Sequence, residues 1–205
     1  MILKRVPWGA VKPSYGAVGD WGDPINNGLV GYWLLGEGGG LTAYDIAGLN
    51  HGTLTGGPLW DVGKFGKALK FDGVDDYVDA GDKSSLTPTA GLTLSCWVKT
   101  SDTRAFVGVI DKWVNSNTGY MVELSNNGAP QGKPRFTIGS QAAISSAITI
   151  NNGAWRYVVA TCDNVTGTVY VDGVSKGSGS LTMAGISVVQ DVKIGGDGVS
   201  TNYLN

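Results

Sequence analysis

One stretch, residues 64–80, constrains the fold of this chain more than any other. Residues 69–71 read apolar, charged, apolar, which is the alternation of a half-buried strand. Asp72 and Gly73 then supply a turn, because glycine adopts a positive φ without strain. Residues 76–80 alternate again, with two apolar side chains on one face. The stretch therefore predicts a β-hairpin.

The rest of the chain repeats this pattern of short strands and turns. Residues 92–98 alternate with a period of two, and no segment has the period of an amphipathic helix. A chain of 205 residues is long enough for one such domain with a sizeable core. We therefore expect an all-β fold, a two-sheet antiparallel β-sandwich. Besides the hairpin, the expected strands are 29–35, 41–45, 53–54, 92–98, 105–114, 119–124, 134–139, 144–150, 155–162, 167–172 and 191–194.

Charge and hydropathy exclude two classes of partner. The net charge is −2, so no basic excess exists to replace the counterions of a nucleic acid. No apolar run approaches the length that crosses a bilayer, so we expect no membrane insertion. Residues 1–8 lack the apolar segment of a secretory signal. The expected location is extracellular, with a leader that this sequence lacks, or a virion surface, because lysis releases virus particles without a leader.

Cys96 and Cys162 are the only cysteines. Both fall within expected strands, where small apolar side chains are common, and neither has the paired spacing of a zinc or redox motif. Two buried thiols are therefore favoured over a disulfide.

Residues 1–27 differ in composition from the rest of the chain. Three prolines preclude a regular helix there, yet Trp8, Tyr15 and Trp21 make the segment too aromatic for a solvated arm. The sequence favours neither of two alternatives: the arm folds back over its own domain, or its aromatic side chains dock on a protein partner. The sandwich then covers residues 28–205.

Several motifs together resemble a known family. The stretch 64–80 looks like the signature of the laminin-G-like domains of the concanavalin A-like lectin/glucanase superfamily. Further motifs similar to that family occur in the same order at residues 29–35, 45–54, 92–99, 155–161 and 169–173. The resemblance implies an antiparallel jelly-roll sandwich and says little about function.

The end of the sequence departs from that family. A further strand normally comes after the segment 194–196 and pairs beside the first strand, whereas this sequence stops at Asn205. Without the usual last strand, the first strand presents unpaired backbone groups. The N-terminal arm or a strand from another subunit would cover them, unless the chain is a shortened one.

Catalysis is not expected. Glucanases of the superfamily use two glutamates close together on one strand, but Glu37 and Glu123 are the only glutamates and lie far apart in the sequence. His51, the only histidine, lies in a turn without a nucleophile motif or companion metal ligands. Asp75 and Asp76 are adjacent and face opposite sides, as in a solvated turn. We expect no catalytic residues and no enzyme activity.

Calcium is the cofactor to consider. Asp45 and Asn50 bracket a loop that offers a carboxylate, an amide oxygen and backbone carbonyls, which are the hard oxygen ligands of calcium. The resemblance also implies calcium near such a loop, although this loop is shorter than the family pattern. Asp45 and Asn50 are the candidate metal ligands, and a loop without metal is the favoured alternative.

Glycan binding requires aromatic platforms and polar groups that bond sugar hydroxyls. The candidate platforms are Trp60, Trp97, Trp113, Trp155 and Tyr120. Trp33, Trp97 and Trp155 match family positions that look structural, so packing is the favoured role for them. Trp113 instead precedes a polar loop. The candidate ligand-binding residues are Trp113, Tyr120, Asn115 and Asn117.

These observations favour a non-catalytic recognition or structural module. The first hypothesis is a decoration protein on a virus particle, most plausibly a phage, with the arm docked on a partner and the sandwich exposed to bind a glycan. The alternative is a carbohydrate-binding module of a bacterial extracellular protein. A glycoside hydrolase ranks third, because the paired glutamates are missing.

Overall fold

The computed structural model describes residues 26–114, 118–125, 131–186, 189–196 and 203–205. The strands are β1 (Thr42–Ala43), β2 (Gly52–Thr55), β3 (Leu59–Val62), β4 (Lys67–Lys70), β5 (Tyr77–Asp79), β6 (Leu92–Val98), β7 (Val107–Val114), β8 (Thr118–Ser125), β9 (Lys133–Ile138), β10 (Ile144–Ser145), β11 (Arg156–Cys162), β12 (Thr166–Val171), β13 (Val174–Ser180) and β14 (Lys193–Ile194). A 3₁₀ helix, η2 (Ser84–Leu86), precedes β6. None of the helices in the described ranges is long and apolar enough to cross a membrane.

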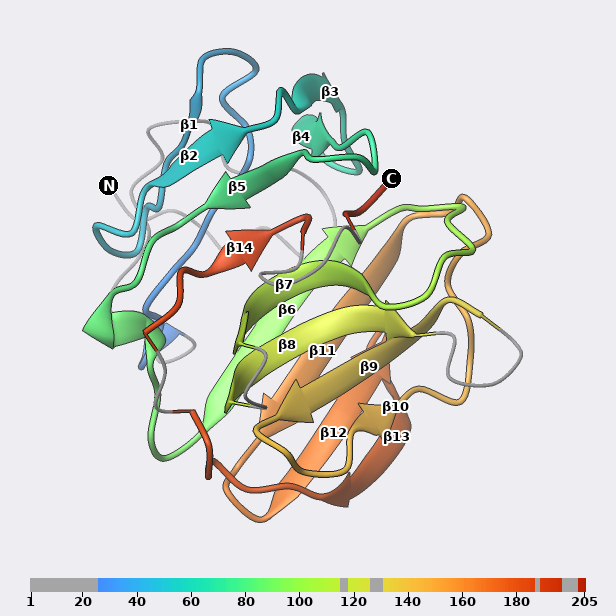
Figure 1. Ribbon diagram of the computed structural model, residues 1–205. Helices are drawn as coiled ribbons and strands as arrows, with labels where there is room; N and C mark the ends of the chain where they lie inside the picture. Colours follow the sequence, from blue (N-terminus) through green and yellow to red (C-terminus); the bar gives the residue numbers. More distant parts are fainter. Residues whose placement is uncertain (1–25, 115–117, 126–130, 187–188, 197–202) are drawn as a thin grey trace, which may run out of the picture.

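The strands form two stacked sheets and a small third sheet. In Figure 1, β7, β8 and β9 lie in front of β6, β11 and β12. The eight-stranded sheet has the order β1-β2-β5-β14-β7-β8-β9-β10, and the four-stranded sheet has the order β13-β12-β11-β6. All strand pairs are antiparallel. The expected all-β sandwich is confirmed.

Alternating side chains from both sheets fill the space between them. Val122 on β8 and Phe136 on β9 are 3% and 0% exposed, and Val169 on β12 is 1% exposed. Each has neighbours along its strand that point the other way, because successive side chains of a strand alternate between faces. Cys96 and Cys162 lie on the inner face of the four-stranded sheet as free thiols; Cys162 is buried as expected, and Cys96 is partly buried.

The prediction that residues 64–80 form a β-hairpin is wrong, because the two strands of this stretch do not pair with each other. β4 pairs with the preceding β3, whereas β5 joins the eight-stranded sheet between β2 and β14. Gly73 does adopt a positive φ of 78°. However, the buried Asp76 carboxylate accepts a hydrogen bond from the Asp72 N–H at 2.9 Å and closes a wider loop. This loop carries the chain from one sheet to another and does not return it along β4.

No strand forms at residues 29–35, where the sequence predicts the first one. Trp33 makes only an isolated bridge with Asp45, and the Tyr32 N–H donates to the Asp45 carboxylate at 2.7 Å. Leu35 has a φ of 52°, outside the extended region. A side-chain carboxylate therefore binds this backbone in place of a neighbouring strand.

One edge of the four-stranded sheet lies on β6. Within the described ranges, β6 pairs with β11 on one side only. Its sequence contains no charged residue or proline, which are common protections of an edge. The chain end lies close by, because the Thr100 hydroxyl donates to the Asn205 carbonyl oxygen at 2.6 Å. In the described ranges β1, β10 and β13 are edge strands as well.

Candidate functional site

Two aromatic rings lie side by side on the outer face of the four-stranded sheet. Trp97 on β6 is directly opposite Tyr157 on β11, and their ring centroids are 5.3 Å apart at an interplanar angle of 31°. Both side chains point away from the core because Cys96 and Val158, their neighbours in sequence, point into it. Trp97 is 41% exposed. This pair therefore offers an aromatic face to ligands in solution.

A third ring reaches this pair from the small sheet. β3 and β4 are joined by a tight turn in which the Gly63 N–H donates to the Gly66 carbonyl at 2.7 Å. The tip of this turn carries Phe65, whose ring meets Trp97 edge-on, with centroids 5.4 Å apart at 85°. We call Phe65, Trp97 and Tyr157 the aromatic surface.

Lys64 places a cation at the border of the aromatic surface. Its Nζ lies 5.5 Å from the Trp97 centroid and 5.8 Å from that of Phe65. These distances fall within the range of cation–π attraction, which holds the ammonium near the rings.

An ion pair borders the other side of Tyr157. Asp172 accepts a hydrogen bond from the Tyr157 N–H at 3.0 Å and from the Arg156 guanidinium at 2.8 Å. Burial raises the pKa of Asp172, but the Tyr157 N–H, Arg156 and the charge of Lys64 together outweigh burial, so the pKa lies below its usual value. Asp172 therefore stays ionised and can accept hydrogen bonds from ligand hydroxyls.

Hydroxyl groups cover the sheet below the aromatic surface. The strand registers place two further outward rows across the sheet. One row is Ser95, Val159, Tyr170 and Ser175, and the other is Thr93, Thr161, Thr168 and Ser178. Thr168 and Ser178 share a hydrogen bond of 3.0 Å. An aromatic face beside a flat array of hydroxyls has the two components that bind sugars: ring faces for C–H groups and hydrogen-bonding partners for hydroxyls.

The sequence assigned Trp97 to packing and did not single out Lys64 or Phe65. The alternation of residues 92–98 places Trp97 on the face of the strand that points away from the core. This pattern was the sequence signal that could have identified Trp97 as a surface residue. Phe65 approaches Trp97 because β3 pairs with β4. The sequence pattern instead predicted that β4 pairs with the following strand, so it did not predict this contact.

The aromatic residues that the sequence favoured as surface ligands are buried instead. Trp113 is 8% exposed and Tyr120 is 3% exposed. The Tyr120 hydroxyl donates to the Leu86 carbonyl at 2.9 Å, and burial followed by the charge of Asp111 raises the pKa of this phenol. Neither side chain therefore provides a stacking face. Asn115 and Asn117 lie outside the described residues.

The expected calcium ligands bind N–H groups instead. Asp45 Oδ1 accepts hydrogen bonds from Tyr32 and Ala47, at 2.7 and 2.9 Å. Its Oδ2 accepts two from Asn50, at 3.2 Å from the backbone and 3.0 Å from the side chain. Asn50 Oδ1 accepts from the Ser85 hydroxyl at 3.1 Å. Because donors already occupy these oxygens, the pair does not fit a calcium site and acts as a clasp for the loop.

Three aspartates lie close together in the loop between β4 and β5. Carboxylate oxygens of Asp72, Asp75 and Asp76 lie within 4.8 Å of one another. Asp76 is buried, and this burial, together with the two neighbouring carboxylates, raises its pKa although the Asp72 N–H lowers it. Asp75 is exposed, as expected of a solvated turn, but the same expectation is wrong for Asp76, which is buried and accepts a hydrogen bond from the Asp72 N–H.

The two glutamates are separated in the structure as well. Glu123 on β8 is buried and pairs with Arg135 on β9, with the two charged atoms 3.0 Å apart. Glu37 accepts a hydrogen bond from the Tyr44 N–H at 2.9 Å, near β1. They therefore do not form the paired carboxylates of a glycosidase.

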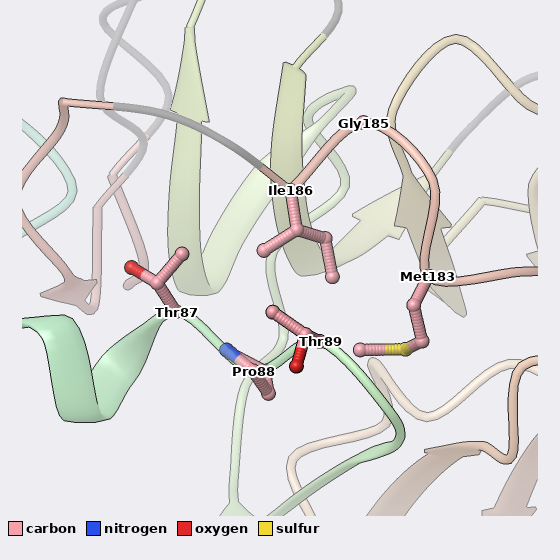
Figure 2. Close-up of a pocket in the computed structure, with 6 residues that line it drawn as sticks. All are labelled: Thr87, Pro88, Thr89, Met183, Gly185 and Ile186. Atoms are coloured by element: carbon pink, nitrogen blue, oxygen red, sulfur yellow. The ribbon is translucent and has the colours of Figure 1, made fainter.

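A small pocket lies at the other end of the sandwich. Figure 2 shows Thr87, Pro88 and Thr89 facing Met183, Gly185 and Ile186. Its lining is mainly apolar and includes no charged group. The side chains of its lining offer two threonine hydroxyls and neither a charged group nor an aromatic ring, so the aromatic surface is the better candidate. The proposed docking residues Trp8, Tyr15 and Trp21 lie outside the described residues.

Comparison with known families identifies the fold. A family model described as the concanavalin A-like lectin/glucanases superfamily matches residues 72–205, more than half of the chain. The resemblance found in the sequence is confirmed. A search of curated proteins finds no significant match.

Solved structures share the fold at low sequence identity. Domain 4 of AbnA, a GH43 extracellular arabinanase from Geobacillus stearothermophilus, in complex with arabinotriose, aligns with a TM-score of 0.60 and 20% identity, over 75% of this chain and 77% of that one. The binding domain of Paraclostridial Mosquitocidal Protein 1 aligns with a TM-score of 0.60 and 16% identity, over 79% and 43%. The binding domain of botulinum neurotoxin serotype C1 aligns with a TM-score of 0.56 and 16% identity, over 78% and 43%. The chain thus spans less than half of either toxin domain, and identities this low establish the fold alone.

Proposed function

The chain belongs to the concanavalin A-like lectin/glucanase superfamily, and we propose that it is a non-catalytic binding module that holds a glycan on its aromatic surface. One observation carries this proposal. The exposed ring of Trp97 lies against Tyr157 at the border of a sheet face rich in hydroxyls. Binding domains among the proteins of similar fold support the same class of function.

Sugar binding follows from the chemistry of this face. A pyranose or furanose ring stacks its C–H groups on Trp97 and Tyr157, which desolvates both surfaces. Its hydroxyls then reach Asp172 on one side and the Ser95 row on the other, because these residues lie next to the rings in the strand register. The rings supply most of the affinity and the polar groups select the orientation of the sugar.

A glycan array followed by calorimetry tests the proposal. Trp97→Ala is expected to lower the affinity for the bound glycan about tenfold, which corresponds to roughly 1.4 kcal/mol. Tyr44→Ala is the matched control, because Tyr44 is 38% exposed and contacts His51 away from the aromatic surface. Equal affinities of the two variants, or no glycan bound by the intact chain, would contradict the proposal.

The proposal includes the absence of turnover. Glu123 faces Arg135 and Glu37 faces the Tyr44 N–H, so neither has a second glutamate as a partner in catalysis. Incubation with any glycan that binds is expected to release no reducing ends. If the protein hydrolyses a glycan and Glu123→Gln abolishes this hydrolysis, the protein is an enzyme and the proposal is wrong.

A place on a virus particle is the second candidate. The observation that favours it is the edge of β6, which pairs with no second strand in the described ranges, contains no charge or proline and can pair with an extended segment of a partner. In this arrangement the sandwich faces outward and the edge or the N-terminal arm holds the module in place. Light scattering of the purified chain tests it. An assembly that dissociates when residues 1–27 are removed supports a docked module, and a monomer both with and without these residues contradicts it.

A further inference from the structure

We infer that the aromatic surface selects sugars that carry a carboxylate, with Lys64 as the residue that pairs with the acid group. This inference rests on the proposed function and names its ligand class. It depends on the charges that surround the rings.

Lys64 has no ion-pair partner among the residues that the structure describes. No carboxylate of the described ranges lies within ion-pair distance of its Nζ, whose contacts are the rings of Phe65 and Trp97. Arg156, which precedes Tyr157, is paired with Asp172 at 2.8 Å. Lys64 therefore places a positive charge without an ion-pair partner in the described ranges beside an exposed tryptophan.

The position of Lys64 suits a group attached to a stacked sugar. Its Nζ lies 5.5 and 5.8 Å from two ring centroids, at the border between Phe65 and Trp97. A sugar lying on Trp97 with its carboxylate directed toward the β3–β4 turn brings the acid group to this ammonium. Stacking desolvates the carboxylate in part, which strengthens its attraction to Lys64 relative to that in open water.

Asp172 does not compete with Lys64 for a sugar carboxylate. It is paired with the Arg156 guanidinium at 2.8 Å, so that side of Tyr157 presents an ion pair in which both charges are already matched. A sugar acid is therefore attracted at the Lys64 border. A neutral sugar experiences no such attraction.

The experiment compares acidic and neutral sugars on the full chain by calorimetry. The acidic probes are trigalacturonate, for a polysaccharide source, and sialyllactose, for a glycoprotein source; the neutral probes are arabinotriose and lactose. At least one acidic probe is expected to bind more tightly than both neutral probes, and added salt is expected to reduce that difference. Lys64→Gln is expected to lower the affinity for the acidic probe about two- to fivefold, the range of a single exposed ion pair, and to leave neutral probes unchanged.

Lys70→Gln is the matched control, because Lys70 is an exposed lysine on the same small sheet and its substitution is expected to have no effect. Equal binding of acidic and neutral probes, with loss in Trp97→Ala, overturns this inference and keeps the proposed function. An equal loss for both kinds of probe in Lys64→Gln also overturns it. Absence of binding by all four probes, unchanged in Trp97→Ala, overturns both.

Discussion

The side-chain amide of Asn50 donates a hydrogen bond to Oδ2 of Asp45 at 3.0 Å, and both residues are buried. This contact closes the loop between β1 and β2 and fixes the segment before β1, because Asp45 also binds the Tyr32 N–H. The pair therefore stabilises a part of the chain that no strand pairing secures.

Asp45→Ala is expected to destabilise the fold by about 3 kcal/mol, because it leaves several buried N–H groups without acceptors. Urea unfolding followed by tryptophan fluorescence measures this loss. Asp61→Ala, which removes an exposed carboxylate on β3, is the control and is expected to change stability by less than about 0.5 kcal/mol. A small effect of Asp45→Ala would show that the Asp45–Asn50 pair contributes little to the stability of the fold.

Calcium is expected to leave the melting temperature unchanged. The oxygens of Asp45 and Asn50 already accept hydrogen bonds from N–H and hydroxyl groups, so a cation would have to displace these donors. Differential scanning calorimetry with millimolar calcium or with chelator provides the comparison. An increase of several degrees with calcium, abolished in Asp45→Asn, would restore the calcium site that the sequence suggested.

Breaking the buried ion pair of Lys112 is expected to be costly. Lys112 is 0% exposed and its Nζ lies 2.6 Å from Asp82 Oδ1. Asp82→Ala leaves the buried ammonium without its carboxylate and is expected to cost about 3 kcal/mol, whereas Lys112→Met, with Asp82 free to reach solvent, is expected to cost less. Chemical unfolding of the two single variants and the double variant gives the coupling free energy between Asp82 and Lys112. Equal losses in both single variants would contradict this asymmetry.

Acid is expected to destabilise the protein partly through Asp102. Burial raises the pKa of Asp102, but hydrogen bonds from the Arg104 side chain and backbone outweigh burial and hold the pKa below its usual value. A lowered folded-state pKa means that the unfolded chain binds the proton first, so the stabilisation is present above about pH 4 and is lost as the pH falls through the folded-state value. Asp102→Asn is expected to reduce the drop in urea midpoint on acidification. An unchanged drop would show that other carboxylates account for it.

Cys96 is expected to resist thiol reagents in the folded state. Burial raises its pKa to about 12, so almost no thiolate forms at pH 8, and the thiolate is the reactive species. Burial also raises the pKa of Cys162. Titration with a chromogenic disulfide is expected to label the two cysteines only after denaturation. Rapid labelling of the folded protein at pH 8, lost in Cys96→Ser, would contradict this expectation.

The alternation of side chains made the sandwich predictable. Leu92, Leu94, Cys96 and Val98 alternate with polar residues, and the structure places these four toward the core. The pairing of β4 was not predictable from the same signal, because a turn sequence such as Asp72-Gly73 does not reveal whether the next strand returns or crosses to another sheet.

The candidate site was harder to predict than the fold. Trp97 and Tyr157 are distant in sequence and meet only through the β6–β11 register, and Phe65 reaches them from a third sheet. Trp113 failed as a surface residue because a polar loop in sequence need not leave the preceding strand exposed.

The Gly63–Gly66 turn brings Lys64 and Phe65 to rings that the sandwich itself supplies. Under the proposed function, this turn governs which ligand binds, whereas the packing between the two large sheets governs the stability of the fold. A change in the length of this one turn is then expected to alter ligand preference and to leave the sandwich folded.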